Sequence, residues 1–187
     1  MYRTPAPRWQ RAVEFLLADF PRLVRSEAGC MWAAAALFVV PLVTMFVLLQ
    51  WQPELIYGVM DPAAIAQAER SFDPAAEHSK LGRDSGSDWQ MFGHYIMNNI
   101  SIGLRTFASG LLFGIGTILV LIFNGLHIGA TFGHLQQIGS GDPMWRFVAG
   151  HAPFELTAIV LAGGAGLRLG LNLVAPGRRR RSDALVV

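Results

Sequence analysis

The sequence predicts an all-α membrane protein, a polytopic helical bundle of about four transmembrane helices with an interfacial amphipathic helix at its N-terminus and a broken, glycine-rich core. Of the 187 residues, 52% are hydrophobic and only 15% are charged, whereas a typical soluble domain carries about a quarter charged residues. The charges gather in a few regions. The stretches between them reach the roughly 20 apolar residues that a helix needs to cross a bilayer.

Residues 1–28 predict an amphipathic helix on the cytoplasmic surface of the membrane, with Pro21 expected to kink it. Its apolar residues recur at helical spacing between charged ones and include Val13, Leu16, Leu17, Phe20 and Val24. Residues 29–51 follow as a first transmembrane helix, apolar throughout with Pro41 inside. Residues 52–88 form a hydrophilic extracytoplasmic loop, with a short helix predicted at Pro62–Ser71.

Residues 89–175 predict a helical membrane core of about three spans. A first helix is expected from Trp89 to about Phe107, followed by a turn around Ala108–Gly110 and a long helix from about Leu111 to Gln137. We then expect a tight loop at Gly139–Pro143, a short interfacial helix at Pro143–Ala149, and a last span from Pro153, where proline suits the first helical turn, to about Val174.

Charge asymmetry sets the predicted topology. Residues 1–28 are rich in arginine, and residues 176–187 form a basic tail that carries Arg178, Arg179, Arg180 and Arg181. Because positive charge marks cytoplasmic segments, we expect both termini of this chain to lie in the cytoplasm of a multi-pass protein of the bacterial inner membrane. Arg105 and Arg168 then fall near the cytoplasmic face as further topology anchors. An arginine cluster beside a span is typical of an anchor, so we do not expect a nucleic-acid partner.

Polar residues inside the apolar region are the main indication of function. His94, Asn98, Ser101 and Arg105 share one face of their helix, and Asn124, His127, Thr131 and His134 share a face of the next. Polar groups in lipid usually face a partner, a cavity or a pathway. Side-chain hydrogen bonds that only fix helix packing explain such residues equally well. The predicted polar core comprises His94, Asn98, Asn99, Asn124, His127, His151 and Glu155.

The segment from His151 to Glu155 is the sharpest local feature of this core. If Pro153 begins a helix, Glu155 lies in its first turn, where the helix dipole stabilises a carboxylate. His151 would then lie just before that helix, within reach of Glu155. A pair of this kind is suited to relaying protons or binding a cation, and equally to fastening the outer loop to the bundle.

Glycines at four-residue spacing predict close helix packing. The glycines at this spacing are Gly110 and Gly114 in one pair and Gly125, Gly129 and Gly133 in a series, while Gly163, Gly164 and Gly166 give the last span a surface of small residues. The spacing is compatible with contacts inside one subunit and with a homodimer interface, and it does not distinguish between them.

Motifs for catalysis and metal binding are missing from the sequence. It has no HExxH, no GxSxG and no P-loop, and its five histidines are dispersed. We therefore predict no catalytic residue, no metal site, no cofactor and no enzymatic activity.

The sequence resembles the stage II sporulation protein M family of bacterial integral membrane proteins. The residues that carry the resemblance are Asn98-Asn99-Ile100, the glycines from Gly110 to Gly116, Asn124-Gly125, and His151 with Phe154-Glu155-Leu156. The resemblance covers about residues 8–170. Family members usually have a further soluble N-terminal stretch and one more hydrophobic span after a basic linker, so an incomplete chain is one interpretation. Many also place proline before the histidine, where this chain has Gly150.

The resemblance implies a non-enzymatic membrane scaffold that assembles with other envelope proteins. We therefore predict a scaffold or assembly partner in bacterial cell-envelope remodelling, with the lipid bilayer and other membrane or envelope proteins as its partners. The alternative is a transporter or channel component whose Asn, His and Glu side chains line a polar pathway, as interrupted helices often do.

Overall fold

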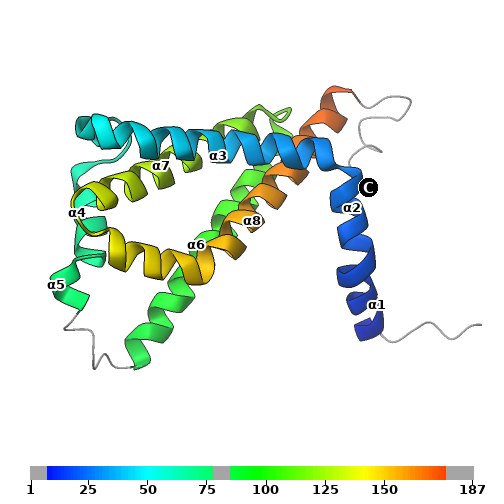
Figure 1. The fold of residues 1–187 in the computed structure, drawn as a ribbon. Helices are drawn as coiled ribbons and strands as arrows, with labels where there is room; N and C mark the ends of the chain where they lie inside the picture. Colours follow the sequence, from blue (N-terminus) through cyan, green and yellow to red (C-terminus); the bar gives the residue numbers. More distant parts are fainter. Residues whose placement is uncertain (1–7, 78–84, 176–187) are drawn as a thin grey trace, which may run out of the picture.

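The helices of this computed structural model, which describes residues 8–77 and 85–175, form a bundle with a projecting arm (Figure 1). Four long helices make up the bundle: α3 (Ala28–Trp51), α6 (Ser85–Ala108), α7 (Ile115–Gln137) and α8 (Gly141–Val174). No strand occurs in the described ranges. The predicted all-helical class is therefore correct.

Three helices in the described ranges are long and apolar enough to cross a membrane. They are Ala28–Trp51, Ile115–Gln137 and the Ala152–Val174 part of α8. The predicted fourth crossing falls on α6, which is not among the three. The count of four spans therefore stays a prediction.

The glycine series brings α3 and α7 together as parallel helices. A Cβ atom added at Gly125 or Gly129 would collide with the backbone carbonyl oxygen of Phe38 or Leu42, and one at Gly133 would lie 3.0 Å from the Phe46 oxygen. The contacts follow the same order along both helices. Two helix backbones can approach this closely only where side chains are absent. Inside this chain, the GxxxGxxxG series thus packs one helix on another.

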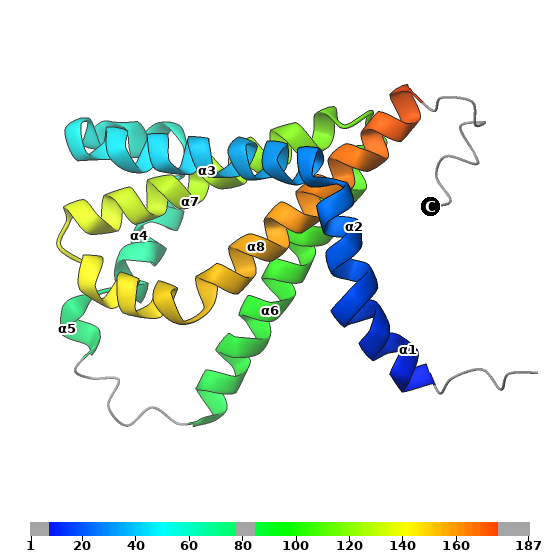
Figure 2. The ribbon, with the colours of Figure 1, turned by 45° about the vertical axis from the view of Figure 1, so that its right-hand side comes forward.

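Helices α6 and α8 also run parallel to each other, and they cross α3 obliquely (Figure 2). Gly110 faces the backbone of Gly166, and Gly114, with φ +82°, faces Gly170. The short 3-10 turn η4 (Ser109–Leu111) joins α6 to α7. The predicted turn between these helices is therefore present, but α7 begins at Ile115, later than expected.

The last helix differs from the prediction. The helix α8 starts at Gly141 and continues through Pro153, whereas we expected a loop, a short helix and a new span beginning at Pro153. Proline lacks the N–H that would bond to the preceding turn, so it bends the helix without ending it. Figure 1 shows this bend between the yellow and orange parts of α8. Glu155 consequently lies in the helix interior, and the stabilisation expected from a helix N-terminus does not apply.

The N-terminal arm (residues 8–26) comprises α1 (Arg8–Glu14), a π-helical turn η1 (Phe15–Asp19) and α2 (Phe20–Ser26). The π-helical turn ends just before Pro21, where a missing N–H disturbs the regular bonding. The arm stands away from the bundle in both views, and Leu16 and Leu17 are 61% and 76% exposed. This exposed apolar surface suits the predicted position in the membrane interface.

The segment between α3 and α6 folds back onto one end of the bundle. It contains the 3-10 turn η2 (Pro53–Gly58), α4 (Pro62–Ser71) and α5 (Pro74–Glu77). The Asp61 side chain accepts hydrogen bonds from the backbone N–H groups of Ala63 and Ala64, each at 3.0 Å. This N-cap starts α4 at the predicted residue. Ile56, Met60 and Ile65 pack on Met45, Leu49 and Ala130 of the bundle.

Candidate functional site

A cavity of about 430 Å³ lies where α4, α6, α7 and the first half of α8 meet. Volumes of this size are typical of small-molecule sites, which are mostly apolar with a few placed polar groups. The lining has that character: the apolar residues include Met60, Phe72, Ile102, Ile128, Phe132, Phe147, Leu156 and Ile159, and the polar ones are Gln67, Ser71, Asn98, Asn99, Asn124, His127, Thr131 and Glu155.

Five of the seven residues in the predicted polar core line this cavity: Asn98, Asn99, Asn124, His127 and Glu155. They come from three different helices. His94 and His151 belong to α6 and α8 by their backbone, while their side chains lie outside what the structure describes. The predicted pair of His151 with Glu155 is therefore not described either.

Helix α7 contributes Asn124, His127 and Thr131 to one wall. The Asn124 amide donates to the Val120 carbonyl at 2.8 Å, and the Thr131 hydroxyl lies 2.9 Å from the His127 carbonyl. These bonds to the same helix hold both side chains in place. The His127 ring stacks on Phe123, with centroids 6.0 Å apart, and its buried Nδ1 has no hydrogen-bond partner in the described ranges.

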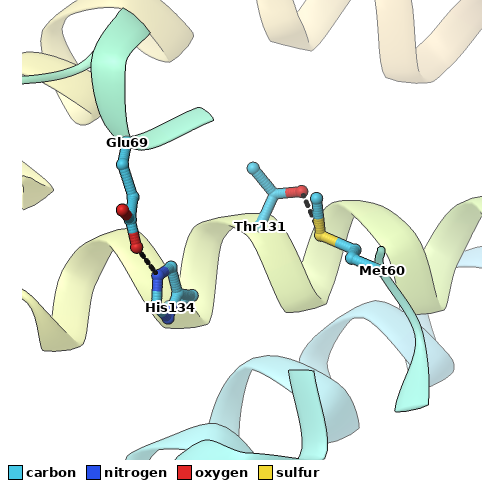
Figure 3. A network of polar contacts seen from close by, with 4 residues as sticks. All are labelled: Met60, Glu69, Thr131 and His134. Atoms are coloured by element: carbon cyan, nitrogen blue, oxygen red, sulfur yellow. Dashed lines mark hydrogen bonds and ion pairs between the residues drawn. The ribbon is translucent and has the colours of Figure 1, made fainter. Parts of the chain in front are cut away.

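Helix α4 and the residue Met60 just before it make polar contacts with α7 (Figure 3). Glu69 Oε1 lies 2.7 Å from His134 Nε2, and the Thr131 hydroxyl lies 3.4 Å from the Met60 sulfur. His134 belongs to the predicted polar face of α7, but it points to α4 and is not among the cavity-lining residues. Glu69 and His134 are 65 residues apart in the sequence. Their contact fastens α4 to the bundle.

Replacing His134 with alanine should loosen α4 without unfolding the bundle, because a pair whose Glu69 side chain is 44% exposed contributes only about 1 kcal/mol. We expect faster hydrogen exchange at the amides of α4, with exchange in α3 and α7 unchanged. Gln137→Ala, at an exposed residue of the same helix, is the control. Equal exchange in both variants would show that the pair does not hold α4.

A family comparison covers most of the chain. The family model of stage II sporulation protein M matches residues 30–187. The chain belongs to the stage II sporulation protein M family. The match begins after the N-terminal arm and so excludes it, and it extends to the last residue. No curated protein and no solved structure matches the chain. Together with its apolar helices, this membership makes the chain a membrane protein of the stage II sporulation protein M family.

The bundle of this family member is tightly packed on the side of the cavity away from α4. Thr106 and Thr117 are fully buried, and the Thr117 hydroxyl donates to the Thr106 carbonyl at 2.8 Å. Gly166 packs against this pair, and a Cβ there would lie 2.5 Å from the Thr117 hydroxyl. Leu121, one helical turn after Thr117 on α7, is also fully buried. The cavity is therefore closed at this end by side chains and backbone in contact.

Two of the predicted topology anchors, Arg105 and Arg168, lie near the same end. Arg168 forms an ion pair with Glu27 at 3.1 Å, and Arg105 is exposed near the end of α6. Arg178, Arg179, Arg180 and Arg181 lie outside the described residues. Ser101 hydrogen-bonds to the Met97 carbonyl of its own helix, so it contributes to α6 alone.

Sequence reasoning missed the contribution of α4 to the site. Gln67, Ser71 and Phe72 line the cavity, and the Phe72 ring packs edge-on against Phe147 of α8, with centroids 5.6 Å apart. No sequence pattern relates Phe72 to Phe147, so their contact could not be predicted. In the described ranges, no group of three or more metal-binding side chains gathers.

Proposed function

We infer that this chain is a non-enzymatic scaffold or assembly partner for cell-envelope remodelling in the bacterial inner membrane. One observation carries the proposal: the segment around α4 is fixed to the end of a closely packed bundle. Membership of the stage II sporulation protein M family supports a membrane protein, and the scaffold role is our proposal for it. A rigid surface loses little entropy on binding, which favours assembly.

The surface proposed to bind an envelope protein is the outer side of η2 and α4. Tyr57 of η2 is 67% exposed, and Ala63 and Arg70 are exposed on α4. Trp51, at the adjoining end of α3, is 76% exposed. On the opposite side of this segment, Ile56 and Ile65 are anchored in the bundle. The segment thus has a buried side that fixes it and an exposed side for a partner.

The proposed topology places this surface outside the cytoplasm. The helix α6 runs parallel to α8 beside it, so we assign it as the fourth crossing. With four crossings, both ends of the chain lie on one side of the membrane, and the arginine-rich termini place that side in the cytoplasm. The N-terminal arm then lies on the inner surface of the bilayer. A homodimer remains compatible with this arrangement.

A photo-crosslinking amino acid at Ala63 tests the proposal in living bacterial cells. We expect it to trap an envelope protein, whereas the same amino acid at Leu119, which is 62% exposed on α7, should trap mainly lipid. His134→Ala, which loosens α4, should weaken the crosslink at Ala63. If Ala63 traps no protein and the α4 segment can be deleted without a growth or envelope defect, the scaffold proposal is wrong.

The alternative proposal is a transporter or channel component, which the polar cavity favours. Transport requires the cavity to open at its other end, and there Gly110 and Gly166 are in backbone contact. A transporter would therefore have to separate α6 from α8. Solute flux into proteoliposomes that falls with Glu155→Gln would favour transport, and unchanged flux would favour the scaffold.

A further inference from the structure

We propose that residues 111–115, which connect α6 to α7, insert into the same bilayer leaflet as the N-terminal arm and form a second membrane anchor. We call this segment the apolar turn. The docking surface proposed above follows the last residue of α3, whereas the apolar turn lies near the first. Insertion of the apolar turn can therefore be tested independently of the scaffold proposal.

The apolar turn exposes large hydrophobic side chains that the protein does not cover. Leu111, Leu112, Phe113 and Ile115 are each more than half exposed. The surrounding stretch, residues 106–123, contains no charged residue that would favour water. Exposed apolar patches of this kind mark contacts with another protein or with a membrane.

The backbone of the apolar turn is held by the protein itself. The Leu112 N–H donates to the Ser109 carbonyl at 3.1 Å, and the Gly114 N–H donates to the Gly110 carbonyl at 2.9 Å. On its other side, Gly114 packs so closely on Gly170 that a Cβ atom at Gly170 would collide with it. Non-helical backbone is tolerated at membrane depth only where such partners satisfy its polar groups. The apolar turn meets this condition.

Phe113 adopts a backbone conformation that phenylalanine disfavours. Its φ is +55°, and it is the one non-glycine residue with a positive φ in the described ranges. Glycine or asparagine suits this left-handed region better. Because the ring is more than half exposed, contacts inside the protein do little to offset the strain. Transfer of the ring from water into lipid would offset it.

The continuity of the exposed surface identifies lipid as the partner. On α7, Ile115, Leu119 and Phe123 recur at i, i+4 and i+8, and each is more than 60% exposed. Helix α7 is one of the three that are long and apolar enough to cross a membrane, so this stripe faces acyl chains. The same stripe continues without interruption into Leu112 and Phe113.

The apolar turn lies at the same end of the bundle as the N-terminal arm. Gly114 contacts Gly170 near the end of α8, and Arg168 on the same helix forms an ion pair with Glu27, the residue that follows the arm. The arm runs across the direction of α3 in both views, so it lies along the surface of a bilayer that α3 crosses. Trp32, near the start of α3, is highly exposed, as is typical of tryptophan at the membrane interface.

Spin labels test the depth of the apolar turn in the whole chain, reconstituted into nanodiscs of phosphatidylethanolamine and phosphatidylglycerol. With Cys30 replaced by serine, a label is attached to Leu112→Cys, Leu119→Cys or Ala63→Cys. Power saturation compares collisions with oxygen, which enters lipid, and with a water-soluble nickel chelate. We expect the oxygen-to-nickel ratio at residue 112 to exceed that at residue 63 severalfold and to approach that at residue 119. A ratio at residue 112 equal to that at residue 63 would place the turn in water and overturn the proposal.

A second copy of the chain covering the apolar turn would give a different result. The label at residue 112 would then be shielded from oxygen and nickel alike, and its spectrum would sharpen on dilution with unlabelled chain. That outcome would also overturn the proposal, because the partner would be protein.

Phe113→Asn tests whether the ring anchors the turn. Asparagine tolerates the left-handed backbone but removes the apolar ring, so we expect the oxygen-to-nickel ratio at residue 112 to fall severalfold. Tyr57→Asn, at an exposed aromatic residue of η2, should leave that ratio unchanged. The thermal midpoint of Phe113→Asn should equal or exceed that of the parent chain, which separates loss of depth from loss of folding. An unchanged ratio in folded Phe113→Asn would contradict an anchoring role for the ring.

Discussion

Gly129→Ala is expected to destabilise the bundle by about 3 kcal/mol, at the upper end of the range for overpacked cores. The new methyl group would collide with the Leu42 carbonyl oxygen and lie 3.0 Å from the Leu42 Cα. These are backbone atoms of α3, so no side-chain rotation relieves the clash. The two helices must separate along their length.

The measurement is the midpoint of unfolding of the purified protein in mixed micelles, and Gly150→Ala is the control. Gly150 also lies inside a helix, but a Cβ there meets nothing within 4 Å. Alanine should therefore stabilise that variant slightly, by up to about 1 kcal/mol. If both variants behave alike, the α3–α7 contact is not the close approach that the glycine series indicates.

Sequence patterns identify the helices of this protein well where the signal is local. The Asp61-Pro62 pair fixes the start of α4, because the side chain caps the helix and proline suits its first turn. Apolar length alone indicates α3. The helix start predicted at Pro153 is wrong because a proline in a membrane helix either starts the helix or bends it, and neighbouring helices decide which. That decision depends on contacts distant in the sequence.

In the candidate site, too, the features that depend on local spacing were predicted, and those that depend on contacts distant in the sequence were not. Helical spacing placed Asn124, His127 and Thr131 on one face, and the structure places all three at the cavity. The partner of His134 could not be predicted, because Glu69 lies in a segment with no periodic relation to α7. Asn98 and Glu155 also belong to the predicted polar core, but the cavity that both line is formed only when α4 and the bent α8 pack beside α6 and α7.

Leu121 and Gly163 offer a test of the packing at the closed end of the cavity. Leu121 is fully buried, and a Cβ at Gly163 would lie 2.9 Å from both of its methyl groups. Leu121→Ala should cost about 3 kcal/mol by leaving a void. Gly163→Ala should cost about 1 kcal/mol, since the methyl groups it meets are the movable end of a side chain.

The double variant should be more stable than the sum of these losses predicts. The methyl group added at Gly163 would occupy part of the space that Leu121→Ala vacates, so the two changes offset each other by about 1 kcal/mol in a double-mutant cycle. Unfolding midpoints of the four proteins supply the cycle. Strict additivity would mean that the two residues are not in contact. The packing of α7 on α8 beside the cavity would then be looser than the contact of Leu121 with Gly163 indicates.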